Sequence, residues 1–346
     1  MNRVRELRLQ RALGQAELGR RAGISRQSVN AIERERAQAS VQTALGLARA
    51  LDVSVEDLFG FTAGAQARWL DDEISPAVGM RVAVERWDQT AVARPLAACP
   101  PDSFPAAHGA VRRVTGDQVQ VEIWQARPAL FLYGCDPALG LLASHVNRNG
   151  SEGWWWNATN ARALALLKAE RARVVALHHG VLEARAVDRS CLRIRLVGWE
   201  SGWLVAKGNP KRISGADDLA RPELTVAVRE EGAESRRLFE QQMAQADLGW
   251  ADLGGRAIVG RSQLAVARLV AQGQADMAIG HAGAAVAWAC DLVPIRQEVT
   301  DLLIPQKVAD QPELAALLTT MTSHRFRRDL ASSGPYDTAR TGDQVG

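Results

Sequence analysis

Hydrophobic positions in the first sixty residues follow helical periodicity and predict a bundle of short helices. Residues 15–33 predict two helices joined by a sharp turn at Gly23, which supplies the positive φ that such a turn requires. Ser25 is expected to cap the second helix through its side-chain oxygen. Val29 and Ile32, three residues apart, are expected to face the core of this bundle.

The second of these helices carries a polar stripe. Gln27, Asn30, Ala31 and Arg34 fall at i, i+3, i+4 and i+7 and are therefore expected on one outward face. Gln and Asn side chains pair with adenine and Arg with guanine, so a short helix of this kind suits the major groove of DNA. The alternative is an ordinary solvated helix surface.

Charge favours DNA over a plain solvated surface. Residues 1–36 contain nine arginines and four glutamates, a net charge of +5, whereas the whole chain carries only +3. Positive charge is therefore concentrated on the segment that would meet phosphates, where it adds salt-sensitive affinity.

The same segment resembles the XRE, or Cro/C1-type, helix-turn-helix family. The similarity runs through VRELRLQRALGQAELGRRAGISRQSVNAIERERAQASVQTALGLARALDVSVEDLF, from Val4 to Phe59. It implies an all-α helix-turn-helix bundle over residues 1–62. The implied DNA-binding residues are Gln15, which would touch phosphate, together with Ser25, Arg26, Gln27, Ser28, Asn30 and Arg34. The loop RERAQAS at 34–40 departs from the Gly and Pro that many relatives carry.

Residues 63–128 have a different pattern of apolar and polar residues. Residues 81–87 and 118–124 alternate apolar and polar side chains and read as half-buried strands, separated by the Pro-rich segment 98–109. We expect a small β-rich connector here, after a flexible linker at 61–66.

From residue 129 onward, apolar strands alternate with amphipathic helices, which predicts parallel strands with crossover helices. Strands are expected at 129–133, 173–177, 225–228, 257–259, 275–279 and 302–304, and a terminal helix at 313–330. Strand-to-helix turns in such sheets bind ligands because free N–H groups point there.

This half also resembles a periplasmic-binding-protein-like effector domain. The similarity rests on GCDPALGLLASHV, KGNPKRISGADDLARPEL, REEGAESRRLFEQ, LAVARLVAQGQADMAIG, LVPI and FRRDLASSGPYDTARTG, in that order. It implies a two-lobed α/β domain at 129–340 with a small molecule between the lobes. Lobe I would comprise about 129–199 and 286–335, and lobe II about 200–285.

Polar residues at the strand ends are the candidate ligand contacts, because amide, hydroxyl and guanidinium groups at helix N-termini form an anion cradle. They are Cys135, Asp136, Asn157, Thr159, Asn160, His178, Arg229, Ser235, Arg236, Arg261 and Ser262.

Each of these has a structural alternative. Arg229 and Arg236 have acidic neighbours for ion pairs, and the residues at 157–160 are suited to capping the next helix. His178 lies at the end of a strand, and the alternatives to ligand contact are packing of its side chain or exposure to solvent. The acid at Glu234 weighs against a bare oxyanion as the ligand.

The Trp triplet 154–156 has two interpretations. Strand alternation places Trp154 and Trp156 on one face and Trp155 on the other. Burial under the sheet accounts for them simply, whereas an aromatic wall beside the cleft would favour a flat organic ligand.

Composition indicates the compartment in which the protein is expected and the partners it is expected to lack. The 346 residues contain no apolar run long enough to cross a bilayer and no N-terminal signal, which predicts a cytoplasmic protein without a membrane partner. Four scattered cysteines predict reduced, buried thiols rather than a zinc site, and no cofactor or metal is expected.

The sequence thus predicts a one-component transcription regulator, not an enzyme. Its expected partners are double-stranded DNA, a small effector and further copies of itself in a homodimer or higher homo-oligomer. The effector would be an oxyanion such as molybdate, or a small carboxylate or heterocycle. Two rivals remain: an enzyme on the same two-lobed fold, although no paired nucleophile and base is visible, and a domain that has lost its ligand and serves only oligomerisation.

Overall fold

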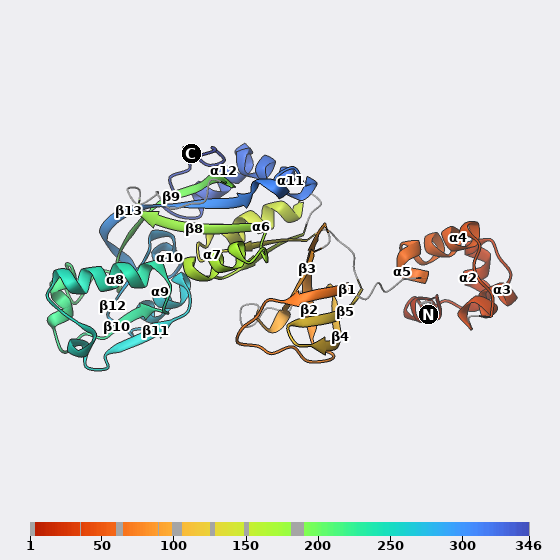
Figure 1. Ribbon diagram of the computed structural model, residues 1–346, viewed down its shortest axis with the longest axis horizontal. Helices are drawn as coiled ribbons and strands as arrows, with labels where there is room; N and C mark the ends of the chain where they lie inside the picture. The colour runs from red at the N-terminus through yellow and green to blue at the C-terminus, as the bar shows by residue number, and fades with distance from the viewer. Residues whose placement is uncertain are drawn as a thin grey trace. The chain divides into compact units, whose positions relative to one another are not determined.

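The computed structural model describes residues 4–34, 36–59, 65–88, 90–98, 106–124, 129–148, 152–180 and 190–345. The chain divides into two compact units, residues 1–127 and 128–346 (Figure 1). The first unit contains a helical part and a β-barrel, and the second contains one large sheet with helices on it. No described helix is long and apolar enough to span a membrane.

The helical part is built from α1 to α5 around an apolar core. The core is formed by fully buried side chains that include Leu18, Val29, Leu47 and Leu51. The helices are α1 (Val4–Gln10), α2 (Gln15–Ala22), α3 (Arg26–Glu33), α4 (Val41–Leu51) and α5 (Val55–Phe59). This architecture confirms the expected helix-turn-helix bundle.

The turn between α2 and α3 has the expected geometry. Gly23 adopts φ 72°, and Ser25 caps α3 by accepting a hydrogen bond from the Ser28 backbone N–H at 3.0 Å. Val29 and Ile32 are 0 % and 3 % exposed. A Cβ on Gly19 would lie 2.7 Å from the carbonyl oxygen of Ile24, so the turn also needs a glycine inside α2.

The middle segment forms a closed five-stranded barrel with strand order β1-β3-β2-β4-β5. Only β2 and β5 match the strands expected from alternation. The strands are β1 (Ala65–Trp69), β2 (Arg81–Trp87), β3 (Thr90–Pro95), β4 (Gly109–Thr115) and β5 (Gln118–Ile123), with a 3₁₀ turn at Leu96–Ala98. Of the expected linker, residues 65 and 66 belong to β1, and 61–64 lie outside the described residues, as do 99–105 of the Pro-rich segment.

The second unit is organised on an eight-stranded sheet of order β11-β10-β12-β9-β13-β8-β6-β7. The strands are β6 (Ala129–Tyr133), β7 (Glu152–Trp156), β8 (Val174–Gly180), β9 (Cys191–Val205), β10 (Val226–Arg229), β11 (Ala257–Gly260), β12 (Met277–His281) and β13 (Asp291–Pro305). The helices are α6 (Ala138–Arg148), α7 (Asn160–Lys168), α8 (Glu234–Gln245), α9 (Gln263–Ala271), α10 (Ala282–Ala287), α11 (Pro312–Thr322) and α12 (His324–Ser332), with short 3₁₀ turns at Ala216–Ala220, Trp250–Leu253 and Gln306–Val308.

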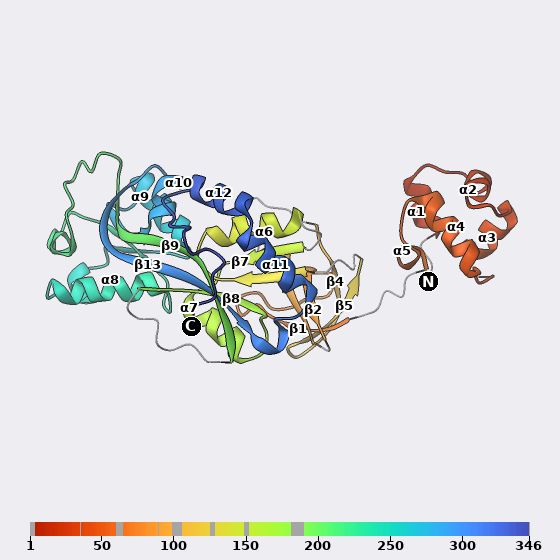
Figure 2. The same cartoon turned by 90° about the horizontal axis from the view of Figure 1, so that it is seen from above.

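Two lobes share this sheet. Within lobe I, β6 runs parallel to β7 and β8, and within lobe II, β10 runs parallel to β11 and β12. The long antiparallel strands β9 and β13 join the lobes, as Figures 1 and 2 show. The expected parallel strands are therefore confirmed within each lobe, and antiparallel strands connect them.

The strand β13 corrects two expectations. It is fifteen residues long rather than the short strand expected at 302–304. It pairs with β8 only from Glu298 onward, and α10 packs on α9 and β12 of lobe II. The chain thus returns to lobe I near residue 296, about ten residues after the expected boundary at 286.

The single terminal helix expected at 313–330 is wrong. Two helices, α11 and α12, meet at Ser323, which has extended backbone angles and caps α12 by accepting from the Phe326 N–H. After α12 the chain returns to β9, where Asp337 and Gln344 pair with Gly198 and Ile194.

Candidate functional site

Helix α3 and its C-cap residue Arg34 carry the polar side chains expected to contact DNA. Arg26, Gln27 and Arg34 are exposed, and Ser28 and Asn30 are half-buried. The Ser25 hydroxyl is used in the cap and also bonds the Ser28 hydroxyl at 2.8 Å. Since the apolar residues of α3 face the core, the helix offers this polar face to an external partner.

Gln15 has an internal role in the same bundle. Its amide Nε2 donates to Glu33 Oε2 at 2.8 Å, and Glu33 also receives Arg8 Nε at 2.6 Å. This network ties α1, α2 and α3 together. The side chain expected to touch phosphate is therefore held in place by an intramolecular hydrogen bond.

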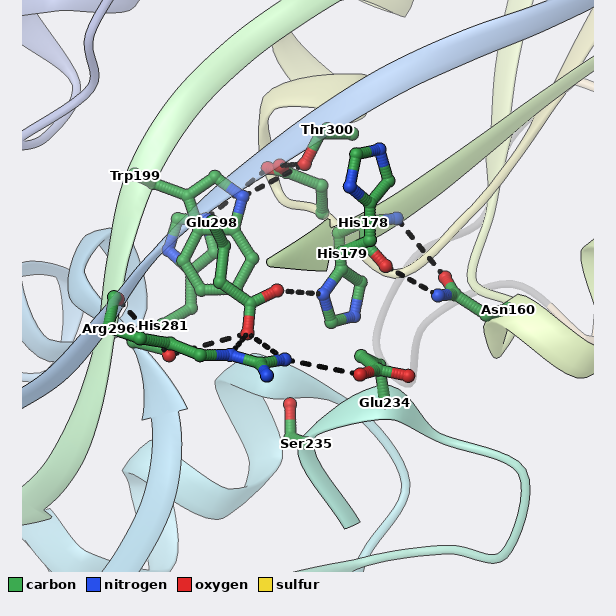
Figure 3. Close-up of polar contacts among 12 residues, drawn as sticks. Asn160, His178, His179, Trp199, Glu234, Ser235, His281, Arg296, Glu298 and Thr300 are labelled. Atoms are coloured by element: carbon green, nitrogen blue, oxygen red, sulfur yellow. Dashed lines mark hydrogen bonds and ion pairs between the residues drawn. The ribbon is translucent and has the colours of Figure 1, made fainter. Parts of the chain in front are cut away.

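In the second unit, a line of charged side chains crosses between the lobes (Figure 3). Glu298 on β13 is 1 % exposed, and its two carboxylate oxygens accept from His178 Nδ1 and Arg296 Nε, each at 2.9 Å. Arg296 also reaches Glu234 at the start of α8, with Nη2 and Oε1 3.1 Å apart. Burial alone would raise the pKa of Glu298, but His178 and Arg296 outweigh it and lower the pKa to about 2.

A second buried carboxylate lies at the start of α6. Asp136 accepts from the Ala138 N–H at 2.9 Å and from Thr300 Oγ1 at 2.5 Å, and His281 Nε2 lies 3.6 Å away. Tyr336, from the segment after α12, donates its hydroxyl to the same carboxylate at 3.4 Å. Burial raises the pKa of Asp136, but His281, Thr300 and the Ala138 N–H together lower it.

Cys135 precedes this carboxylate and is 3 % exposed. The charges of His178 in lobe I and Arg229 in lobe II act on its thiol. Burial would raise the pKa of the thiol, but His178 and Arg229 outweigh it, so the pKa is lowered. In the order Glu298, His178, Cys135, Arg229, groups that favour negative and positive charge therefore alternate.

Arg229, at the end of β10, is 1 % exposed and is paired with its neighbour in sequence. Its Nε and Nη2 donate to the two carboxylate oxygens of Glu230 at 2.7 and 2.8 Å. The ion-pair alternative raised for Arg229 is thus realised within the cleft. The guanidinium of Arg236 lies 4.2 Å above the Trp250 ring and donates to Glu240 at 3.1 Å and to the Arg229 carbonyl oxygen at 3.2 Å.

The polar residues expected at the strand-to-helix turns mostly serve helix ends and lobe contacts. Thr159 and Ser262 cap α7 and α9, accepting from the Arg162 and Ala265 N–H groups. The remaining contacts are Asn157 Nδ2 donating to the Arg261 carbonyl oxygen across the lobes at 2.8 Å, Asn160 bonding the His178 backbone on both sides, and Ser235 Oγ accepting from Gln263 Nε2 at 2.8 Å.

The Trp triplet follows strand alternation, as expected. The rings of Trp154 and Trp156 stack with centroids 5.7 Å apart, and Trp155 on the other face donates to the Gly134 carbonyl oxygen at 2.8 Å. Trp156 is 2 % exposed and packs edge-on against Phe131. Packing under the sheet thus accounts for Trp156.

Several polar residues of this site were not predicted from the sequence. Arg296, Glu298 and Thr300 alternate along β13, and Trp199 on the paired strand β9 donates its indole N–H to Thr300 at 2.9 Å. Polar residues at every second position before the apolar run at 302–304 were the sequence signal that could have identified this strand face. Another miss is the contact between His178 on β8 and Glu298 on β13, because these residues are far apart in the sequence.

Comparison with known families supports both halves of the chain. Residues 145–322 match the model of the PBP superfamily domain, and residues 4–58 match a helix-turn-helix model. The chain therefore belongs to the PBP superfamily and carries a helix-turn-helix domain at its N-terminal end. It joins a DNA-binding domain to a PBP-like ligand-binding domain.

Two relatives illustrate the breadth of the similarity. The uncharacterized protein YvgK of Bacillus subtilis (strain 168) is 28 % identical over 240 residues, covering 66 % of this chain and 77 % of that protein. An uncharacterized protein from the 5′ region of the ferredoxin 2Fe-2S gene of Clostridium pasteurianum is 34 % identical over 85 residues, 24 % of this chain and 75 % of its own.

Solved structures with a similar fold include two binding domains. The sulfate-binding protein SubI from Mycobacterium tuberculosis H37Rv aligns with a TM-score of 0.46 at 16 % identity, covering 60 % of this chain and 85 % of its own. The effector binding domain of QuiR in complex with shikimate aligns with a TM-score of 0.41 at 11 % identity, covering 56 % and 95 %.

Proposed function

We propose that this chain is a one-component transcription regulator that acts in the cytoplasm as a homodimer. The observation that carries the proposal is the joining, in one chain, of a helix-turn-helix bundle and a two-lobed binding domain. Dimerisation is proposed because one recognition helix covers only a half-site of an operator.

For the DNA half, the proposed contacts are those of the exposed face of α3 and its flanks. The residues that approach the DNA bases are Arg26, Gln27, Ser28 and Asn30, and Arg34 approaches DNA from the end of the helix. Ser25 and Gln15 hold the helix in place and lie near phosphates. This assignment is supported by the apolar packing of Val29 and Ile32, which orients the polar side chains outward.

For the ligand half, the pair between Arg229 and Glu230 indicates the chemistry of the effector. Glu230 offers both carboxylate oxygens to one guanidinium, which is the geometry of a bound carboxylate. The Glu230 side chain is 26 % exposed, while that of Arg229 is fully buried. We therefore propose that a small ligand carboxylate replaces Glu230 on Arg229.

A tetrahedral oxyanion such as molybdate fits this cleft less well. Glu234 and Glu298 already neutralise Arg296, and Glu298 also neutralises His178, so little unpaired positive charge remains among these side chains. A bare dianion would face these acids, whereas a carboxylate on an organic framework adds only one negative charge and brings apolar surface. A carboxylate-bearing heterocycle satisfies the same requirement.

Ligand binding affects DNA only if it favours one arrangement of the lobes. The lobes touch directly through Asn157 and the Arg261 carbonyl group, and through the Arg296–Glu234 pair. A ligand that strengthens or replaces these contacts shifts the balance between open and closed lobes. The shift regulates transcription when the two arrangements differ in operator affinity.

The decisive experiment combines a ligand screen with operator binding by the full chain. We expect one or more small carboxylates to raise the melting temperature and to change the affinity for a fragment of the protein's own promoter in gel-shift assays. Molybdate and sulfate serve as the oxyanion comparison. Absence of binding to any promoter fragment at low ionic strength would overturn the regulator, and stabilisation by oxyanions alone would overturn the carboxylate assignment.

An enzyme on the same fold predicts a different outcome of this screen. A stabilising compound that is consumed over time indicates turnover, whereas stoichiometric binding without conversion indicates a sensor. A domain that serves only oligomerisation would give neither stabilisation nor conversion.

A further inference from the structure

The C-terminal segment, residues 334–345, lies along one of the two strands that join the lobes. Its backbone is bonded to the first half of β9, where the Asp337 N–H donates to the Gly198 carbonyl oxygen at 2.8 Å and the Gly198 N–H donates back at 2.9 Å. Thr341 is fully buried, and its Oγ1 donates to the Leu196 carbonyl oxygen at 2.7 Å. The second half of β9 pairs instead with β12 of lobe II. The neighbour of β9 therefore changes from the C-terminal segment in lobe I to β12 in lobe II.

This change of neighbour coincides with the point where the joining strands are least regular. His281, the last residue of β12, pairs with Ser201, and Asp337 pairs with Gly198, so only residues 199 and 200 of β9 lie between them. The adjacent strand β13 has register shifts at 294–296 and at 300–301, on either side of the same point. Because a register shift interrupts the ladder and bends the strand, residues 199–200 and 296–300 are suited to act as the hinge between the lobes.

Tyr336 of the C-terminal segment touches both lobes at this hinge. On the side of lobe II it packs against α10, where a Cβ on Gly283 would lie 2.9 Å from the Tyr336 hydroxyl oxygen and a Cβ on Gly334 would lie 3.2 Å from the Gly283 Cα. Its ring centroid is 5.2 Å from that of His281. On the side of lobe I its hydroxyl donates to Asp136 Oδ1 at 3.4 Å. The close approach to α10 thus relies on glycine at two facing positions.

Asp136 is held firmly within lobe I. Thr300 Oγ1 donates to its Oδ2 at 2.5 Å and accepts from the Trp199 indole N–H at 2.9 Å, so β9, β13 and the start of α6 are linked at the hinge (Figure 3). His281 of lobe II stacks on Trp199 with ring centroids 3.9 Å apart, but its Nε2 lies 3.6 Å from Asp136 Oδ1, beyond hydrogen-bond distance. Burial and the neighbouring Asp136 raise the pKa of the Tyr336 hydroxyl, which therefore remains a donor.

We propose that residues 334–345 form a clasp that keeps the lobes closed, and that Tyr336 is the residue through which the clasp holds lobe II. A rotation about the hinge would carry Gly283 and His281 away with lobe II. Tyr336 would remain with Asp136, because the rest of the clasp is bonded to the lobe I half of β9. Opening therefore has to break the packing of Tyr336 on α10, so the clasp favours closed lobes before any ligand is bound.

The test measures the distance between the lobes of the full chain with a pair of spin labels and pulsed electron paramagnetic resonance. The helices α7 and α8 belong to different lobes and begin close together, since a Cβ on Gly232 would lie 3.1 Å from the Ala161 Cβ. The labels are attached at Lys168→Cys on α7 and Gln241→Cys on α8, both exposed. Cys99→Ser and Cys191→Ser complete the parent, and the remaining two cysteines are buried.

Tyr336→Ala removes both the ring and the hydroxyl. We expect it to raise the share of a longer interlobe distance about tenfold over the parent, because a hydrogen bond and a packed ring are lost together. Tyr336→Phe keeps the ring and should raise that share only about threefold. Should the Ala variant lose its native Trp fluorescence, the Phe variant decides. Distance distributions identical to that of the parent would overturn the proposal.

Thr341→Val is the matched control within the same segment. It also loses a hydroxyl hydrogen bond, but one that joins the segment to β9 within lobe I. We expect its distance distribution to match the parent, because the contact of Tyr336 with α10 is kept. Opening as large as in Tyr336→Ala would show that any loosening of the segment suffices, and would overturn the role of Tyr336.

This inference goes beyond the proposed regulation and does not depend on it. The interlobe distance is measured without DNA or effector, and operator binding is measured separately. A chain that binds its operator but whose lobe distance ignores Tyr336 would refute the clasp alone. A chain that opens in the Tyr336 variants but binds no DNA would refute the regulator alone.

Discussion

The helix-turn-helix bundle and the two-lobed domain use polar side chains in opposite ways. On α3, Arg26 and Gln27 are exposed and the helix is held by apolar contacts of Val29 and Ile32. In the two-lobed domain, Glu298, Arg229 and Asp136 are 1–2 % exposed and already have partners within the chain. One region offers its polar groups to solvent, and the other holds them inside.

The difference has an energetic consequence for binding. DNA displaces counterions and water from exposed arginines, so the domain keeps its internal contacts when it binds. A ligand in the two-lobed domain must replace an internal partner such as Glu230. Its net affinity is therefore only the difference between the free energies with which the ligand and Glu230 bind Arg229. Binding in the cleft is therefore coupled to rearrangement, which is the property a sensor requires.

The largest expected effect comes from removing a buried cation. Arg229→Ala leaves the carboxylate of Glu230 without its partner, and we expect a loss of about 4 kcal/mol of unfolding free energy. The control Arg328→Ala, whose side chain is 67 % exposed and pairs with Asp329, should cost much less. Urea unfolding followed by Trp fluorescence measures both, since residues 1–62 contain no Trp. Equal losses would contradict the contrast between buried and exposed cations.

The next effect concerns the exposed face of α3. Gln27→Ala with Asn30→Ala should remove about 3 kcal/mol of discrimination between operator and unrelated DNA, with little change in stability. Gel shifts with both DNAs, at two salt concentrations, give the ratio of affinities. Gln241→Ala, on the exposed side of α8, is the control for loss of an amide. Sequence preference that survives in the double variant would argue against α3 as the recognition helix.

A smaller effect should depend on pH. The folded-state pKa of Glu298 is about 2 and its ordinary value is 4.5, so its contribution to stability is present above pH 4.5 and is lost as the pH falls toward 2. We expect Glu298→Gln to be about 2 kcal/mol less stable than wild type at pH 6, and this gap to close on acidification. The measurement is urea unfolding at a series of pH values. A gap that is constant with pH would show that the carboxylate charge is not the stabilising feature.

The smallest expected effect is the cap of α3. Ser25→Ala removes the acceptor for the Ser28 N–H and should cost about 1 kcal/mol, whereas Ser25→Asp should restore most of it. Helical circular dichroism during thermal unfolding monitors the bundle. Identical behaviour of the Ala and Asp variants would indicate that the cap does not stabilise the helix.

Much of the helical part was predictable because its determinants are close together in sequence. Gly23 and Ser25 set the turn and the cap from within two residues, and the spacing of Val29 and Ile32 identifies the buried face. The stacking of Trp154 on Trp156 followed from strand alternation for the same reason. Local backbone geometry and periodicity decide these features.

Where the sequence interpretation went wrong, a local cap was overlooked in one element and long-range pairing decided the others. An apolar pattern continues from 313 to 330, but Ser323 ends α11 and caps α12, so the chain turns there. The first half of β13 looks too polar for a strand and is ordered by pairing with β9. In the barrel, β1 joins β3 and β5, which are distant in the chain.

The amino-acid sequence by itself determined the helix-turn-helix bundle, its outward polar face and the α/β character of the second half, because short-range periodicity and capping encode them. Only the tertiary structure decided which charges meet in the cleft. The line from Glu234 through Arg296 and Glu298 to His178 is assembled from α8, β13 and β8. Each residue alone has many possible partners, and burial between two lobes selects one set because an unpaired charge there is too costly to keep.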